Sequence, residues 1–288
     1  MTRYKPFSQH FWKLAHGRSL EIGPRSVIMG ILNVTPDSFS DGGRHEDPVA
    51  AIAAAKRMIK AGAAIIDIGG ESTRPGATPV TAALEQARVI PVIKALAWLP
   101  DVLISIDTWR AETADLAVSA GAHIVNDVWG LQKDPAMAAV IARHQAGCVI
   151  MHSGRERNKD GDVVADQIAY LSKSLQIAYA GNIAEEAIVI DPGFGFGKEP
   201  GENIELLARF GELMALEKPL LVGTSRKRFV GEMTGKGIRV RDNGTAATSV
   251  LCRMKGGAVF RVHDVSRNRD ALAVADAVLT AGGSIAME

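Results

Sequence analysis

The sequence predicts a single (β/α)8 (TIM) barrel domain over residues 27–288, preceded by a short N-terminal appendage over residues 1–26. Three observations predict this fold class. Eight short apolar segments recur along the chain, a helical pattern follows each of them, and no linker or shift in composition divides the 288 residues. Strands that alternate with helices form parallel sheets, and closed barrels of this kind reach about 250 residues in one domain. An open, doubly wound sheet is the alternative.

The predicted strands are nearly continuous apolar runs of five to seven residues, rich in Val and Ile. Such runs are typical of strands that are buried on both faces of a parallel sheet. In chain order the eight predicted strands cover residues 27–33, 64–70, 103–108, 123–128, 148–152, 187–192, 220–225 and 258–263.

The predicted helices lie between these strands and after the last one. They cover residues 49–61, 81–97, 111–120, 136–146, 166–180, 203–216, 245–255 and 268–281. Asp-Pro pairs at 47–48 and 134–135 are typical of helix starts, because Asp caps the N-terminus and Pro needs no amide partner there. Glycine is enriched, at 29 of 288 residues. Six glycines follow helical segments, where we expect left-handed C-caps: Gly62, Gly121, Gly147, Gly181, Gly256 and Gly282.

Composition narrows the possible functions. Lys and Arg number 33 against 32 Asp and Glu, for a net charge of +1, and hydrophobic residues make up 47%. This balance excludes a disordered tail, a collagen-like fibre and a highly charged nucleic-acid binder. No apolar stretch approaches the 18 residues of a membrane span, and Cys148 and Cys252 lie in apolar runs without metal-ligand spacing. We therefore expect a soluble, cytoplasmic protein with neither a nucleic-acid nor a membrane partner.

Polar or ionisable residues follow every predicted strand directly. Any one of these residues could cap the N-terminus of the helix that follows it. In a barrel, however, the carboxyl ends of all eight strands lie at the same end, where active sites are found. Some of these groups suit a flat ligand rich in N–H groups and others suit a phosphate. The hydrogen-bonding groups are Asp107, Asn126 and Asp191, and the cationic candidates are Arg74, Lys227, Arg261 and His263. Loops 35–43 and 70–79 have the composition of segments that close over a substrate.

The glycine-rich segment 191–198 (DPGFGFGK) is not a nucleotide-binding loop. A Walker A motif needs Gly where this chain has Pro192 and Ser or Thr where it has Glu199. Its glycines alternate, so the dinucleotide fingerprint is absent too. A loop in which the backbone and Phe196 approach a flat ligand fits the sequence better.

Taken together, these segments resemble the dihydropteroate synthases, enzymes of folate biosynthesis. The matching segments, in the family's order, are GILNVTPDSFSDGG, GAAIIDIGGESTRPGA, ISIDT, GAHIVNDV, VIMH, IDPGFGFGK, LLVGTSRK and FRVHDV, which extend from Gly30 to Val265. The chain departs from the family pattern after the third strand, at residues 107–110, and after the fifth, at 152–160. Two alternatives remain open: the pterin-binding domain of a corrinoid methyltransferase, and a catalytically silent pterin-binding paralogue.

The resemblance implies transfer of a 7,8-dihydropterin-6-ylmethyl group from its diphosphate to p-aminobenzoate. It implies catalytic roles for Asp107, Asp191, Lys227, Arg261 and His263, and a Mg²⁺ ion held by Asn33 on the diphosphate. The implied pterin and diphosphate contacts are these five together with Thr73, Asn126, Met151, Phe196 and Gly223. The implied p-aminobenzoate pocket comprises Thr35, Pro36, Phe39, Thr73, Arg74, Pro75 and Ser225. The family is usually homodimeric, so we also expect a homodimer.

Overall fold

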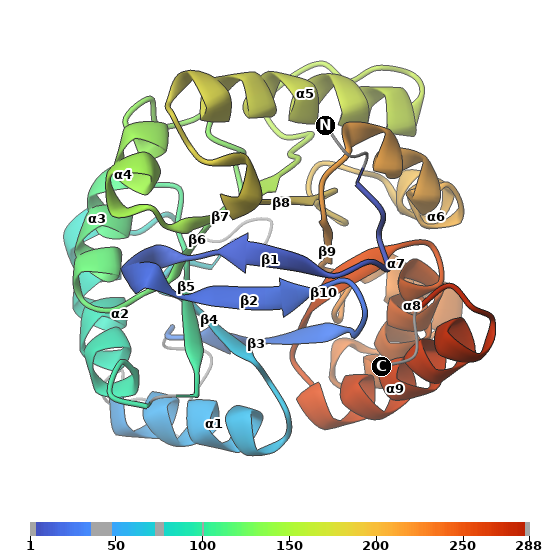
Figure 1. Cartoon of the computed structure of the whole chain (residues 1–288), viewed down its shortest axis with the longest axis horizontal. Helices are drawn as coiled ribbons and strands as arrows, with labels where there is room; N and C mark the ends of the chain where they lie inside the picture. Colours follow the sequence, from blue (N-terminus) through green and yellow to red (C-terminus); the bar gives the residue numbers. More distant parts are fainter. Residues whose placement is uncertain (1–3, 36–47, 73–77, 100, 286–288) are drawn as a thin grey trace.

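Eight parallel strands form a closed barrel that helices surround on all sides (Figure 1). The computed structural model describes residues 4–35, 48–72, 78–99 and 101–285. The strands follow chain order around the barrel, and the last pairs with the first to close it. They are β3 (Val27–Asn33), β4 (Ile65–Gly69), β5 (Leu103–Asp107), β6 (Ile124–Asp127), β7 (Gly147–Met151), β8 (Ile188–Asp191), β9 (Leu220–Val222) and β10 (Gly257–Val262). The predicted (β/α)8 barrel is confirmed, and the open sheet is excluded.

The helices pack their apolar sides against the outside of the barrel, in one large cluster of buried side chains. They are α1 (Pro48–Lys60), α2 (Ala82–Leu96), α3 (Ala111–Ser119), α4 (Met137–His144), α5 (Val163–Ala180), α6 (Pro200–Ala208), α7 (Arg228–Thr234), α8 (Asp242–Arg253) and α9 (Val265–Ala281). Helix α7 was not predicted, because seven residues show too little of a helical period. None of the described helices is long and apolar enough to cross a bilayer.

The glycine caps are confirmed at three of the six positions. Left-handed φ angles occur at Gly62 (109°), Gly121 (115°) and Gly256 (101°). The prediction is wrong at Gly147, Gly181 and Gly282, since the first begins β7 and the other two have φ near −80°. After α4, the left-handed residue is instead the exposed Gln145, with φ 50°. A glycine near a helix end therefore indicated a turn without fixing which residue adopts the unusual backbone.

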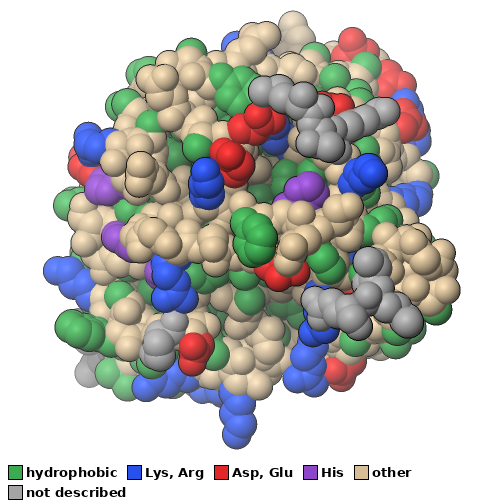
Figure 2. Space-filling view, in the orientation of Figure 1, with side chains coloured by type: hydrophobic (Ala, Val, Ile, Leu, Met, Phe, Trp, Pro, Cys, Tyr) green, Lys and Arg blue, Asp and Glu red, His purple; other side chains and the backbone are tan. Residues whose placement is uncertain are grey.

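The N-terminal segment, for which the sequence suggested no role, closes one end of the barrel. Strands β1 (His10–Lys13) and β2 (Ser19–Ile22) form an antiparallel hairpin that lies across the N-terminal ends of the barrel strands (Figure 1). Trp12 and Ile22 pack on the first residues of these strands, and the Trp12 indole donates a hydrogen bond to the Ala187 carbonyl oxygen at 2.7 Å. Basic and acidic side chains are interspersed over this face (Figure 2).

Candidate active site

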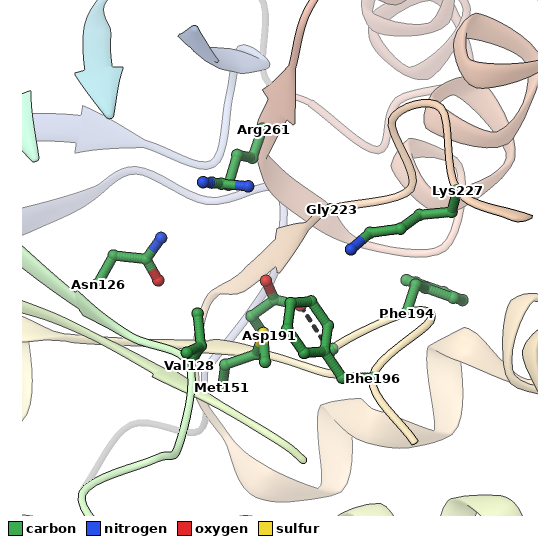
Figure 3. A pocket seen from close by; sticks show the side chains of 10 residues that line it. Asn126, Val128, Met151, Asp191, Phe194, Phe196, Gly223, Lys227 and Arg261 are labelled. Atoms are coloured by element: carbon green, nitrogen blue, oxygen red, sulfur yellow. Dashed lines mark hydrogen bonds between the residues drawn. The ribbon is translucent and has the colours of Figure 1, made fainter. Parts of the chain in front are cut away.

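The opposite end of the barrel holds a cavity at the carboxyl ends of the strands. Its walls come from β6 to β10 and the segments that follow them (Figure 3). The lining residues are Asn126, Val128, Met151, Asp191, Gly193, Phe194, Phe196, Gly223, Lys227 and Arg261. Seven of them were proposed from the sequence as contacts of the pterin or the diphosphate, although they come from five different strands and loops. Barrel closure therefore brings these residues together, as the strand-end argument predicted.

Arg261 links two buried carboxylates beside the cavity. Its Nε donates to Asp67 Oδ2 and its Nη2 donates to Asp107 Oδ2, both at 2.6 Å. Burial raises the pKa of Asp107 to about 7, against the opposing effect of the Arg261 charge. Burial disfavours the guanidinium charge, but the neighbouring carboxylates still raise the pKa of Arg261. The two carboxylates hold the Arg261 cation beside the cavity. An anionic group of a ligand can replace one of them as its hydrogen-bond partner.

Asp191 and Lys227 face the cavity with their charges incompletely compensated. Asp191 Oδ1 accepts a hydrogen bond from the Gly193 amide at 2.7 Å, the dashed line in Figure 3. Burial raises the pKa of Asp191 to about 6 and lowers the pKa of Lys227 to about 8. The Lys227 ammonium lies 4.1 Å from the centroid of the Phe196 ring. Both shifts mean that ionisation is costly in the free site, a common property of binding and catalytic groups.

Unsatisfied acceptors show what kind of ligand the cavity suits. Asn126 Nδ2 donates to Asp67 Oδ2 at 3.2 Å. Asn126 Oδ1 is buried and has no hydrogen-bond partner among the residues that the structure describes, and the same holds for Asp67 Oδ1. Buried acceptors without donors are destabilising, so a ligand with N–H groups would satisfy them. Met151 and Phe196 supply apolar walls for a flat ring.

Ser225 and His263 form a second polar group, outside the cavity lining. Ser225 Oγ lies 2.9 Å from His263 Nδ1, and it accepts a hydrogen bond from the His263 amide at 3.1 Å. Burial, with Arg226 and Arg261 nearby, lowers the pKa of His263 to about 3. The sequence suggested a cationic histidine at this position, whereas burial favours the neutral imidazole in the absence of an anionic ligand.

Asn33, the proposed metal ligand, ends β3 two strands away from Asp107. The residue between them in the sheet is Gly69, and a Cβ atom built there would lie 3.7 Å from both Asn33 Oδ1 and Asp107 Oδ2. The described residues contain no cluster of three or more His, Cys, Asp or Glu side chains able to hold a metal ion. A single amide oxygen suits only an ion that takes its other ligands from water and substrate, as Mg²⁺ does.

The p-aminobenzoate pocket is described only in part. Thr35 lies just after β3 and is half-buried, and Ser225 follows β9. Five proposed residues lie outside the described part of the chain: Pro36, Phe39, Thr73, Arg74 and Pro75.

A hydrogen-bonded network behind the glycine-rich loop was missed from the sequence. Lys198 Nζ lies 2.8 Å from His152 Nδ1 and donates to the Gly193 carbonyl oxygen at 2.9 Å. His152 Nε2 lies 2.8 Å from both Asp166 Oδ2 and Arg157 Nη2, and burial lowers the pKa of His152 to about 3. Burial also lowers the pKa of Lys198 to about 7. The available signal was a lysine at the end of a loop otherwise built from Gly and Phe.

Comparison with known proteins identifies the class first. The model of the family described as "Pterin binding enzyme" matches residues 29–263, which include every strand of the barrel at least in part. The chain is therefore a barrel protein of the pterin-binding class. Dihydropteroate synthase of Bacillus subtilis (strain 168) is 44% identical over 265 residues, which is 92% of this chain and 93% of that protein.

Solved structures agree with this relative. Dihydropteroate synthase from Clostridium difficile, in the presence of pteroic acid, has a TM-score of 0.87 and 47% identity over 90% of this chain and 98% of that one. The enzyme from Xanthomonas albilineans, with 4-aminobenzoic acid, has a TM-score of 0.88 and 42% identity over 93% and 98%. This chain belongs to the dihydropteroate synthase family, and the family resemblance seen in the sequence is confirmed.

Proposed function

We propose that this chain condenses (7,8-dihydropterin-6-yl)methyl diphosphate with p-aminobenzoate, yielding 7,8-dihydropteroate and pyrophosphate for folate biosynthesis. One observation carries the proposal: the cavity joins buried acceptors, Asn126 Oδ1 and the Asp191 carboxyl, to the cations Arg261 and Lys227. That combination suits a planar, N–H-rich ring attached to an anionic group. The pteroic acid and 4-aminobenzoic acid in the structures of relatives support the same substrates.

The pterin ring would bind against Met151 and Phe196, with its N–H groups directed at Asn126, Asp107 and Asp191. Because burial raises the pKa values of both aspartates, their negative charges become more favourable when a cationic ring system forms beside them. Lys227 would donate to a ring acceptor. Gly223, at the end of β9, would leave room for the ring, since an added Cβ would lie 3.4 Å from Asp191 Oδ2.

Pyrophosphate leaves readily only when its charge is neutralised. Arg261 would donate to its oxygens, His263 would hydrogen-bond to them, and Thr73 would contact the diphosphate. We propose a Mg²⁺ ion held by Asn33 and the substrate oxygens, which would add positive charge there. Diphosphate binding would compete with Asp67 and Asp107 for the Arg261 guanidinium.

p-Aminobenzoate is a weak, neutral nucleophile, so its position matters more than its deprotonation. We propose that Thr35, Pro36, Phe39, Thr73, Arg74, Pro75 and Ser225 hold it. Its nitrogen would attack the exocyclic carbon, forming the C–N bond as the C–O bond to diphosphate breaks, and the nitrogen would then lose a proton.

A pyrophosphate-release assay tests the proposal. Purified protein with pterin diphosphate and Mg²⁺ should release pyrophosphate only when p-aminobenzoate is added, and isothermal titration should show binding of the pterin diphosphate alone. Binding without release would favour the silent paralogue.

Lys227→Met should abolish release, whereas Arg228→Ala, at the next position and with a side chain 76% exposed, should not. Equal rates for the two variants would mean that the site is misplaced.

We also propose a homodimer. Seven of the fourteen exposed large apolar side chains found in the described residues fall within residues 228–281: Met233, Ile238, Val240, Leu251, Met254, Val274 and Val278. These side chains lie on or beside α7, α8 and α9, and we propose that a second copy of the chain covers them. Light scattering should give twice the mass of one chain, and Leu251→Glu should shift it toward the monomer. The cytoplasmic location stays a prediction.

A further inference from the structure

The segment between β9 and α7 makes a tight turn with an unusual residue in it. The Lys227 amide donates to the Thr224 carbonyl oxygen at 3.2 Å, which closes a β-turn over residues 224–227. The third residue, Arg226, has a φ of 55°. Positive φ at the third position only is the pattern of type II turns, and glycine is favoured there because it has no Cβ. An arginine in this conformation costs free energy, which other contacts must offset.

Those contacts all come from the start of α8. Arg226 Nε donates to Asp242 Oδ1 at 2.8 Å and Nη2 donates to Oδ2 at 2.9 Å, a two-pronged pair with a buried carboxylate. The Arg226 amide donates to Thr245 Oγ1 at 3.1 Å, and its carbonyl oxygen accepts from Arg241 Nη1 at 3.1 Å. The side chain, amide and carbonyl of one turn residue are therefore all fixed to the N-cap residue and first turn of one helix. We call the contacts of Arg226 with Asp242, Thr245 and Arg241 the turn clamp.

The two residues beside Arg226 belong to the proposed site. Ser225 contacts His263, and Lys227 lines the cavity (Figure 3). The Arg226 side chain pairs with α8 instead and does not line the cavity. A left-handed residue between Ser225 and Lys227 sets the directions in which the chain enters and leaves the turn. The conformation of Arg226 thus determines where both neighbouring side chains lie.

We propose that Arg226 is a positioning residue, which the turn clamp to α8 holds in a left-handed conformation so that Ser225 and Lys227 reach the substrates together. The inference rests on the proposed function, because these substrates define what is positioned. Removing the clamp lets the turn relax to an ordinary φ and moves both side chains, so it lowers catalytic efficiency without removing any group that contacts substrate.

Glycine and alanine at position 226 separate the turn from the side chain. Both Arg226→Ala and Arg226→Gly remove the ion pair with Asp242. Alanine disfavours the positive φ of this turn, whereas glycine adopts it without strain. We expect kcat/KM to fall about 100-fold in Arg226→Ala and about 10-fold in Arg226→Gly and in Asp242→Asn. Arg228→Ala removes the exposed pair with Glu232 two residues away and is the matched control, with wild-type kinetics expected.

The measurements are kcat, both KM values, affinity for pterin diphosphate by titration, and the thermal midpoint of each protein. A purely structural role would lower the midpoint and leave kcat and both KM values of the folded protein unchanged; that result would overturn the inference. Equal kcat/KM values for Arg226→Ala and Arg226→Gly would also overturn it. If Arg226→Ala does not fold, unchanged kcat and KM values in Asp242→Asn would overturn the inference. A wild-type protein that neither binds nor turns over pterin diphosphate would instead overturn the proposed function, and this inference with it.

Discussion

The two ends of the barrel use burial in opposite ways. At the N-terminal end, the hairpin buries Trp12 and Ile22 against apolar strand residues, and the buried indole N–H has its partner. At the C-terminal end, Asp107, Asp191 and Lys227 are buried. Burial raises the pKa of both aspartates and lowers the pKa of the lysine, so it favours the neutral form of each. Apolar burial stabilises the fold, whereas burial of these charged groups costs stability.

This difference suggests that stability and activity are largely divided between the ends of one barrel. Apolar burial at the closed end contributes favourable free energy of folding. This contribution offsets the cost of burying charged groups at the open end. The open end keeps groups such as Asn126 Oδ1 without protein partners, ready for a ligand. Substitutions in the cavity should therefore change activity with little loss of stability. Substitutions under the hairpin should lower stability with little change in activity.

The largest expected effect is on turnover, at the open end. Asp191→Asn keeps the shape and the hydrogen bond from the Gly193 amide but removes the charge that favours a cationic pterin. We expect kcat to fall about 10²- to 10³-fold, as for the loss of one well-placed electrostatic group. Because burial destabilises this carboxylate, the thermal midpoint at pH 7.5 should stay the same or rise. A large loss of midpoint would contradict the proposed division.

The reverse result is expected at the closed end. Trp12→Ala removes a fully buried indole and its hydrogen bond to Ala187, and should lower the free energy of unfolding by about 3 to 5 kcal/mol. Urea unfolding measures this loss. The kcat of the folded variant should remain within about twofold of wild type, since no described cavity residue contacts the hairpin core. The result also tests whether the hairpin of β1 and β2 is an integral part of the barrel fold.

A pH dependence follows from the raised pKa of Asp191. The folded protein holds this proton up to about pH 6, while the unfolded chain loses it near the usual value of 3.8. Its contribution to stability is therefore present at low pH and is lost as the pH rises from about 4 to 7. Relative to wild type, Asp191→Asn should gain roughly 2 kcal/mol between pH 4.5 and 7.5, the larger part of the full difference of about 3 kcal/mol that the two pKa values imply. Urea unfolding at pH 4.5 and 7.5 measures the gain.

Asp115 provides the control for this dependence. Hydrogen bonds from His144 and Arg143 lower its pKa, and it is partly exposed. Its contribution is fully present above the unfolded pKa of 3.8 and is lost only as the pH falls below that value, so Asp115→Asn should be less stable than wild type by nearly the same amount at pH 4.5 and 7.5. A gain in Asp115→Asn between these pH values equal to that in Asp191→Asn would show that net charge, and not burial, governs the effect.

The sequence predicted the barrel and most of the cavity for one physical reason. Strands buried on both faces are apolar throughout, so a polar residue at the end of such a run, such as Asp107 or Asp191, stands out. Closure then brings eight strand ends to one rim, and no long-range contact has to be guessed. Asp67 was visible in this way too, within an apolar strand, but its partner Arg261 is 194 residues away and only the fold shows the pair.

Other features depend on tertiary contacts that local sequence does not encode. The hairpin strands are four residues each, and their short apolar pattern does not reveal the barrel end that they cover. Helix α7 is too short to show a period. Arg226 looks like one member of a basic run, since neither its positive φ nor its pairing with Asp242 can be read from a single sequence.

The smallest effect lies again at the closed end, where α4 leads into β7. Gln145 is exposed and holds φ at 50°, a conformation that glycine adopts without strain. Gln145→Gly should raise the free energy of unfolding by about 0.5 to 1 kcal/mol, because relief of strain exceeds the added freedom of the unfolded chain. Activity should not change, since the substitution is at the end of the barrel away from the cavity. Urea unfolding and kcat together test this, and a change in kcat would show that the two ends of the barrel are coupled.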